Sequence, residues 1–141
     1  MLIYLSANIF YICYRLKKMI LVTIKNNLLL IEDDFLIGEK LYSSIKQLQN
    51  IEKVHLADNL EKAKTELMLH RYDLAILDLN LPDGNGIELL KWLKEKNKDI
   101  KVFIFSINVE LKKLCLKYGA HAFYDKSHDF DALINDIENF N

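Results

Sequence analysis

The sequence contains few of the residues that cross-link a chain, interrupt its regular structure or give it a strong charge. Its two cysteines, Cys13 and Cys115, are far apart and form neither a metal-ligand spacing nor a disulfide framework, as expected in a reducing compartment. One proline and four glycines leave no Pro/Gly-rich linker. A net charge of −1 provides no basic field that would attract nucleic acid or an anionic membrane. We therefore expect a cytoplasmic globular protein that neither binds nucleic acid nor inserts into a membrane.

The N-terminal segment, residues 1–25, differs from the rest of the chain. Residues 1–14 are nearly all apolar and are followed by Arg15, Lys17 and Lys18. This apolar run is shorter than the roughly 20 residues that span a bilayer, and a signal peptide would carry its positive charge before the apolar run. Three interpretations remain open: translation that truly starts at Met19, an extra helix packed on the domain, or a weak membrane anchor.

From residue 26 to residue 141, apolar strand-like runs alternate with segments of helical periodicity. The strand-like runs are Leu28–Ile31, Lys53–Ala57, Asp73–Leu79, Lys101–Phe105 and Ala122–Tyr124. Continuous apolar runs are typical of strands covered on both faces, and the segments between them repeat apolar residues at helical spacing. Such alternation indicates βαβ units with right-handed crossovers. We predict one α/β domain with a five-stranded parallel sheet.

Two local predictions concern the helices of this domain. Asp58 stands three residues before Glu61, the spacing of a capping box, and predicts that Asp58 begins the second helix. Further along, Leu111, Leu114, Cys115 and Tyr118 recur at the spacing of one inward helix face. Gly119 is placed to end that helix.

Polar residues lie at the carboxyl ends of four of the predicted strands. They are Glu32 with its two acidic neighbours, Asp78, Ser106 and Lys126. In an open parallel sheet these ends meet at one edge, which is where ligands bind. Carboxylates in one cleft repel each other unless a cation lies between them, and hard oxygen ligands favour Mg²⁺. Acids, a hydroxyl and a lysine at one edge therefore predict a phosphoryl-transfer site with a carboxylate nucleophile.

The motifs at these strand ends resemble those of the response-regulator receiver domains of two-component signalling. The resemblance rests on Glu32-Asp33, the run from Asp78 through Pro82 to Gly86, Ser106, Gly119-Ala120 and Lys126, and it covers residues 27–140. It implies a flavodoxin-like, doubly wound (βα)5 fold with strand order 2-1-3-4-5. It also implies no enzymatic activity beyond self-phosphorylation and slow self-dephosphorylation.

The resemblance assigns an acceptor and a metal site. Asp78 would accept a phosphoryl group from a histidine kinase or a phosphotransfer protein. Glu32, Asp33, Asp78 and the backbone carbonyl of Asn80 would hold Mg²⁺. Because the family's acidic pair falls on Glu32 and Asp33, we expect Asp34 to interact with the N-terminus of the first helix instead.

The remaining family positions concern the phosphoryl group and the signal. Lys126 and the hydroxyl of Ser106 would bind phosphoryl oxygens, and Ser106 with Phe123 would form the switch. Two positions depart from the family pattern. Ser127 replaces a common proline, for which a cis bond is far less costly than before other residues, so the conformation of this loop is open. Ile107 replaces a small residue and would narrow access to Asp78.

Other functions fit the sequence less well. A haloacid-dehalogenase-type phosphatase wants a second aspartate two residues after its nucleophile, where this chain has Asn80. A flavodoxin would bind phosphate after the first strand, where the acids would repel it. The main alternative is a degenerate receiver that binds proteins without phosphorylation. We expect a receiver with no effector domain, which signals to a downstream protein through the last two helices and last strand, a surface that also suits a homodimer.

Overall fold

A five-stranded parallel sheet forms the centre of the protein. The computed structural model describes residues 2–23 and 25–140. The sheet has the order β2-β1-β3-β6-β7 and consists of β1 (Asn26–Ile31), β2 (Ile51–Ala57), β3 (Leu74–Leu77), β6 (Lys101–Ser106) and β7 (Ala122–Asp125). Counted along the chain, these five strands have the order 2-1-3-4-5, so the predicted flavodoxin-like architecture is confirmed.

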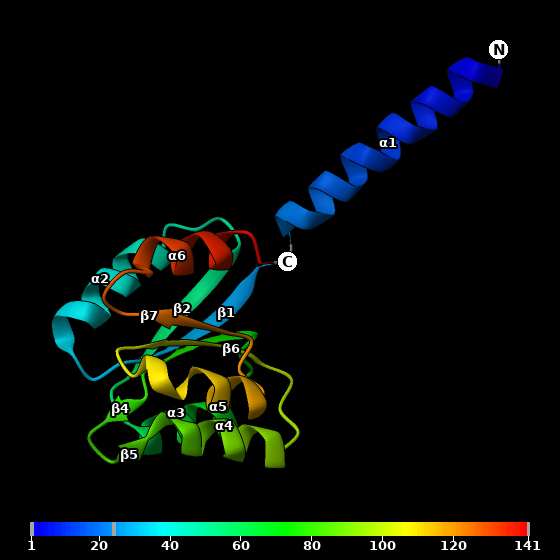
Figure 1. Cartoon of the computed structure of the whole chain (residues 1–141). Helices are drawn as coiled ribbons and strands as arrows, with labels where there is room; N and C mark the ends of the chain where they lie inside the picture. Colours follow the sequence, from blue (N-terminus) through cyan, green and yellow to red (C-terminus); the bar gives the residue numbers. More distant parts are fainter. Residues whose placement is uncertain (1, 24, 141) are drawn as a thin grey trace.

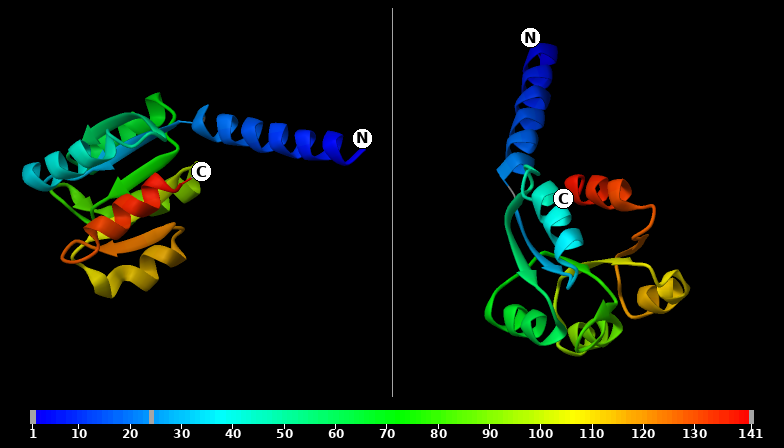
Figure 2. Two further views of the ribbon diagram at one scale, coloured as in Figure 1. Left: turned by 90° about the horizontal axis from the view of Figure 1, so that it is seen from above. Right: turned by 90° about the vertical axis from the view of Figure 1, so that its left-hand side faces the viewer.

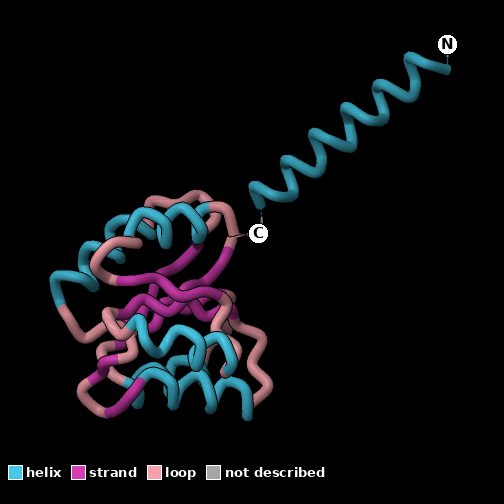
Figure 3. Tube along the Cα trace, viewed as in Figure 1, coloured by secondary structure: helices cyan, strands magenta, loops and turns pink. Residues whose placement is uncertain are grey.

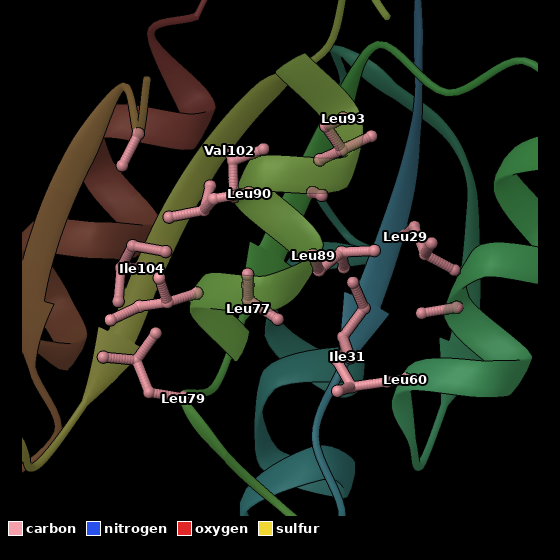
Figure 4. Packing of buried hydrophobic residues seen from close by; sticks show 14 of the residues in the cluster. Leu29, Ile31, Leu60, Leu77, Leu79, Leu89, Leu90, Leu93, Val102 and Ile104 are labelled. Carbon is pink, nitrogen blue, oxygen red and sulfur yellow. The ribbon is translucent and has the colours of Figure 1, made fainter. Parts of the chain in front are cut away.

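Helices cover both faces of the sheet (Figures 1 and 2). One face carries α2 (Phe35–Ile45) and α6 (Phe130–Glu138), and the other carries α3 (Leu60–Leu69), α4 (Gly86–Glu95) and α5 (Lys112–Lys117). Because successive strand residues point to opposite faces, β1 serves both layers. Its Leu29 and Ile31 lie in the core beneath α3 and α4, shown in Figure 4, while Leu28 and Leu30 lie beneath α2 and α6.

Side-chain caps begin the helices α2, α3 and α4. Asp34 accepts a hydrogen bond from the backbone N–H of Ile37 at 2.9 Å and is the N-cap of α2. The prediction for α3 was wrong by one residue. Its N-cap is Asn59, which accepts from the N–H of Lys62 at 2.8 Å, while Asp58 is paired with the Lys62 ammonium. Extended backbone at Asn59 lets its short side chain reach back to the helix.

A small antiparallel hairpin follows β3 and is visible in Figure 3. It consists of β4 (Asn80–Leu81) and β5 (Gly84–Asn85). Gly86 then begins α4, and a Cβ at this position would lie 2.5 Å from the carbonyl oxygen of Asp78. Only glycine therefore allows the chain to return this close to the end of β3.

The segment after β6 is less helical than its periodicity predicts. A 3₁₀ turn, η1 (Val109–Leu111), precedes the six-residue α5. Cys115 is fully buried and Leu111 and Tyr118 pack against the core, but Leu114 is 37% exposed, so its predicted inward position was wrong. The tight 3₁₀ geometry changes the helical phase between Leu111 and Leu114.

The N-terminal helix α1 (Leu2–Thr23) extends away from the sheet and its helices (Figure 1). All of its described side chains, at residues 2–20, are exposed. Side chains exposed along residues 2–20 do not support the interpretation of this segment as a helix packed on the domain. Within the described residues, no helix combines the length and apolar character needed to cross a membrane.

The described side chains of α1 are not buried in the domain. Removal of residues 1–18 should therefore leave the fold of the domain unchanged. We expect a chain that starts at Met19 to match the free energy of unfolding of the full chain within about 0.5 kcal/mol. Urea unfolding followed by circular dichroism measures this difference. A larger loss, or a salt-resistant membrane pellet that requires residues 1–18, would show that α1 has a structural or anchoring role.

Candidate functional site

Backbone hydrogen bonds continue past the strands and place the predicted site residues at the carboxyl edge of the sheet. The N–H of Glu32 donates to Ala57 of β2 at 3.0 Å, and the N–H of Asp78 donates to Ile31 of β1 at 3.0 Å. The N–H of Lys126 donates to the carbonyl of Ser106 at 3.2 Å. Residues from four strand ends are therefore held at one edge by the ladder of the sheet itself.

Lys126 joins two buried carboxylates at this edge. Its ammonium nitrogen lies 2.7 Å from Oε2 of Glu32 and 2.7 Å from Oδ2 of Asp78. Glu32 and Asp78 are 6% and 4% exposed, and the Lys126 side chain is also largely buried. Charged groups removed from water to this degree are stable only when they are paired. Each of the three residues therefore depends on the other two.

Burial and mutual contact change the pKa values of Glu32 and Lys126. Removal from water raises the pKa of Glu32, although the Lys126 ammonium opposes the shift. Burial also acts to lower the pKa of Lys126, but its hydrogen bonds to Asp78 and Glu32 outweigh this effect and raise that pKa above its usual value. Lys126 therefore stays charged throughout the neutral range and holds the two carboxylates together.

Three carboxylates converge next to this lysine. Oxygen atoms of Glu32, Asp33 and Asp78 all lie within 4.8 Å of one another. Asp33 is exposed, which leaves one side of the group open to solvent. Three carboxylates with an open side suit Mg²⁺, which takes oxygen ligands and keeps several waters. Asp34 does not join this group because its carboxylate caps α2.

The loop after β3 lies against the same group. The N–H of Asn80 donates to Oδ1 of Asp78 at 3.3 Å, which brings the backbone of Asn80 next to the acidic side chains. A depression of about 240 Å³ opens beside Glu32 and Asp33 and is also lined by Phe35 and Leu56. The acids are therefore reached from the side on which α2 and α3 begin.

The two predicted switch residues lie in different surroundings. Ser106 is fully buried, and its hydroxyl contacts the side-chain oxygen and the backbone N–H of Asn108, each at 3.3 Å. Phe123 is buried in the core beneath α3, α4 and α5. Sequence reasoning did not identify Asn108, since an asparagine two residues after a strand has no distinctive signal. The switch roles of Ser106 and Phe123 stay predictions.

Ser127 and Ile107 are the two positions that depart from the family pattern, and the structure shows the conformation of the peptide bond before Ser127. No peptide bond in residues 2–23 and 25–140 is cis, so the bond before Ser127 is trans. The N–H of Ser127 donates to Oδ1 of Asp125 at 2.8 Å, and Lys126 still reaches Asp78. The side chain of Ile107 is 60% exposed. Its predicted influence on access to Asp78 stays a prediction.

Comparisons with known families and proteins identify sequences that are similar to this chain. The family model described as "Response regulator receiver domain" matches residues 28–138. The transcriptional regulatory protein MalR of Bacillus subtilis is 33% identical over 107 residues, which cover 74% of this chain and 46% of MalR. The transcriptional regulatory protein CitB of Klebsiella pneumoniae is 32% identical over 114 residues, which cover 79% and 49%. The chain thus spans about half the length of these curated relatives.

Solved structures give the same result for the fold. The receiver domain of the Francisella response regulator 1452 superposes with a TM-score of 0.73 at 26% identity, covering 80% of this chain and 93% of that domain. The non-phosphorylated HemR receiver domain of Leptospira biflexa superposes with a TM-score of 0.70 at 28% identity, covering 83% and 97%. Both are similar to this chain over nearly their whole length.

Proposed function

The chain belongs to the response-regulator receiver domain family, and from that premise we propose that Asp78 accepts a phosphoryl group from a histidine kinase or a phosphotransfer protein. Membership of the family places the chain in two-component signalling. One observation supports Asp78 as the acceptor: its carboxylate is 2.7 Å from Lys126 and within 4.8 Å of two further acids. We also propose the cytoplasm as the site of action, which agrees with two free cysteines.

In this proposal, an oxygen of Asp78 attacks phosphorus while the bond from phosphorus to the donor breaks. With phosphohistidine as donor, the bonding electrons go to the imidazole nitrogen, which then takes up a proton. Lys126 holds the attacking carboxylate in position and offers its N–H groups to an oxygen of the incoming phosphoryl group. Such preorganised charge supplies most of the catalysis in phosphoryl transfer.

The acids beside Asp78 fit Mg²⁺, which receiver domains generally bind. Glu32, Asp33, Asp78 and the carbonyl of Asn80 would hold the ion, since the three carboxylates already converge and the Asn80 backbone lies beside them. When bound, the ion neutralises charge on the phosphoryl oxygens and on the carboxylates.

The output of the proposed reaction is a changed binding surface. A phosphoryl group adds about −1.5 to −2 charge units in phosphorylated hydroxyl side chains, and an acyl phosphate should be comparable. Ser106 would turn toward this charge, and Phe123 would move into the space it leaves. The surface of α5, β7 and α6 would then bind a downstream protein or a second copy of the chain.

Incubation with acetyl phosphate tests this function. With Mg²⁺ present, intact-mass spectrometry should show a gain of one phosphoryl group, which chelation of the metal should prevent. An unchanged mass over a range of donor concentrations would favour the alternative, a degenerate receiver that binds its partners without phosphorylation.

The assignment of the acids makes a separate prediction about metal affinity. We expect Asp33→Ala to weaken Mg²⁺ binding by about tenfold or more, because a ligand is lost. Asp34→Ala should change it less than twofold, since Asp34 serves as the cap of α2. Calorimetric titration of both variants measures the difference. The opposite ranking would place the metal one residue further along the chain.

A further inference from the structure

The tip of the β4–β5 hairpin is fastened to the beginning of α3. The carboxylate of Asp83 accepts hydrogen bonds from the backbone N–H groups of Leu60 at 2.8 Å and Glu61 at 3.0 Å. These bonds join residues 23 and 22 positions apart in the sequence. They also lower the pKa of Asp83, although it is exposed. The carboxylate is therefore ionised at neutral pH and bound to a helix end that favours negative charge.

Two helix caps meet at this junction and act on different atoms. Asn59 accepts from the N–H of Lys62, whereas Asp83 takes the two N–H groups before it. The first N–H groups of a helix have no partner within the helix, so both caps stabilise α3. Only Asp83 also links α3 to another segment of the chain.

Close packing supports the same junction. A Cβ at Gly84 would lie 2.9 Å from Cδ1 of Leu60, so any larger residue at this position of the hairpin would have to displace the end of this side chain. Leu60 is buried, and Figure 4 shows it beside Ile31 of β1 in the core. The hairpin tip is thus attached to a point that the sheet itself holds in place.

We propose that Asp83 is a positioning residue for the magnesium site, because it ties the hairpin to α3 and thereby sets where the backbone carbonyl of Asn80 lies relative to Asp78. This inference rests on the proposed function of the acidic group. The hairpin has two residue pairs, Leu81 with Gly84 at the tip and Asn80 with Asn85 next to the site. A tip held at two atoms leaves this short hairpin little freedom to tilt, so the carbonyl is presented in one orientation.

The test compares two caps of the same helix. Asp83→Ala removes the tie and the cap, whereas Asn59→Ala removes only a cap. Both variants should lower the midpoint of thermal unfolding by about 2–8 °C, as expected for the loss of a helix cap. Only Asp83→Ala should weaken Mg²⁺ binding, by about tenfold, the lower end of what residues that orient metal ligands contribute. Asn59→Ala should stay within twofold of the wild type. Asp83→Asn, which keeps one accepting oxygen, should fall between Asp83→Ala and the wild type.

Direct titration with Mg²⁺ by calorimetry gives the readout, and the Mg²⁺ concentration for half-maximal labelling by acetyl phosphate gives a second one. Equal weakening in Asp83→Ala and Asn59→Ala would overturn the proposal and leave Asp83 as an ordinary helix cap. Unchanged affinity in Asp83→Ala would overturn it as well. If the wild type binds Mg²⁺ but is never labelled, the proposed function fails, while the titration still decides the role of Asp83.

Discussion

Replacement of Asp78 by asparagine should abolish labelling by acetyl phosphate. The amide has almost the same shape as the carboxylate, but it carries no negative charge and its oxygen is a poor nucleophile for phosphorus. The ion pair between Lys126 and Glu32 at 2.7 Å stays available to the variant. We therefore expect Asp78→Asn to keep the circular dichroism spectrum of the wild type and to show no gain in intact mass.

Asp34→Asn is the matched control for this experiment. It makes the same chemical change two residues from Glu32, and asparagine caps a helix as well as aspartate does, so α2 should be unaffected. The control should be labelled like the wild type. Labelling of Asp78→Asn at the wild-type rate would place the acceptor elsewhere and would refute the proposed function.

Replacement of Lys126 by methionine should have the largest effect on stability. It leaves the carboxylates of Glu32 and Asp78 buried next to each other without their cation. Removal of one member of a buried ion pair typically destabilises a protein by 3–5 kcal/mol. We expect a loss of about 3 kcal/mol in the free energy of unfolding, measured by urea titration at neutral pH without divalent metal. Millimolar Mg²⁺ should restore most of this loss and should bind Lys126→Met more tightly than it binds the wild type.

The pH dependence of this loss has a defined direction. The pKa of Lys126 is raised in the folded protein. Its contribution to stability is therefore complete below its ordinary value of 10.5 and is lost as the pH rises through the folded value. The pKa of Glu32 is also raised, so its protonation on acidification favours the folded state. The deficit of Lys126→Met should shrink both at alkaline pH and as the pH falls toward the pKa of Glu32.

Lys62→Met provides the control for the ion pair. Lys62 forms a bridge of 2.8 Å with Asp58, yet both side chains are more than half exposed. Exposed pairs contribute little because water screens them, so this variant should lose less than about 1 kcal/mol. A similarly small loss in Lys126→Met would show that the site tolerates uncompensated carboxylates and that Lys126 does not hold it together.

The sequence by itself determined the class of fold and most of the polar side chains that gather at the carboxyl edge of the sheet. Continuous apolar runs and helical periodicity specify strand and helix from neighbouring residues alone, and their alternation leaves few topologies other than a parallel sheet. Once the sheet is parallel, every strand ends at one edge. This reasoning was enough to bring Glu32, Asp78 and Lys126 together, as the structure does.

Only the tertiary structure decided which polar atoms meet beyond that edge. Asn59 rather than Asp58 caps α3, Ser106 contacts Asn108, and Asp83 reaches across to α3 from a loop 23 residues away. The separation of α1 from the domain was also undecided by its composition. Periodicity reports which face of an element is buried, because burial follows from side-chain direction. Hydrogen bonds between distant segments depend instead on how the packed elements lie against one another, to within a fraction of an ångström, and no local pattern encodes that.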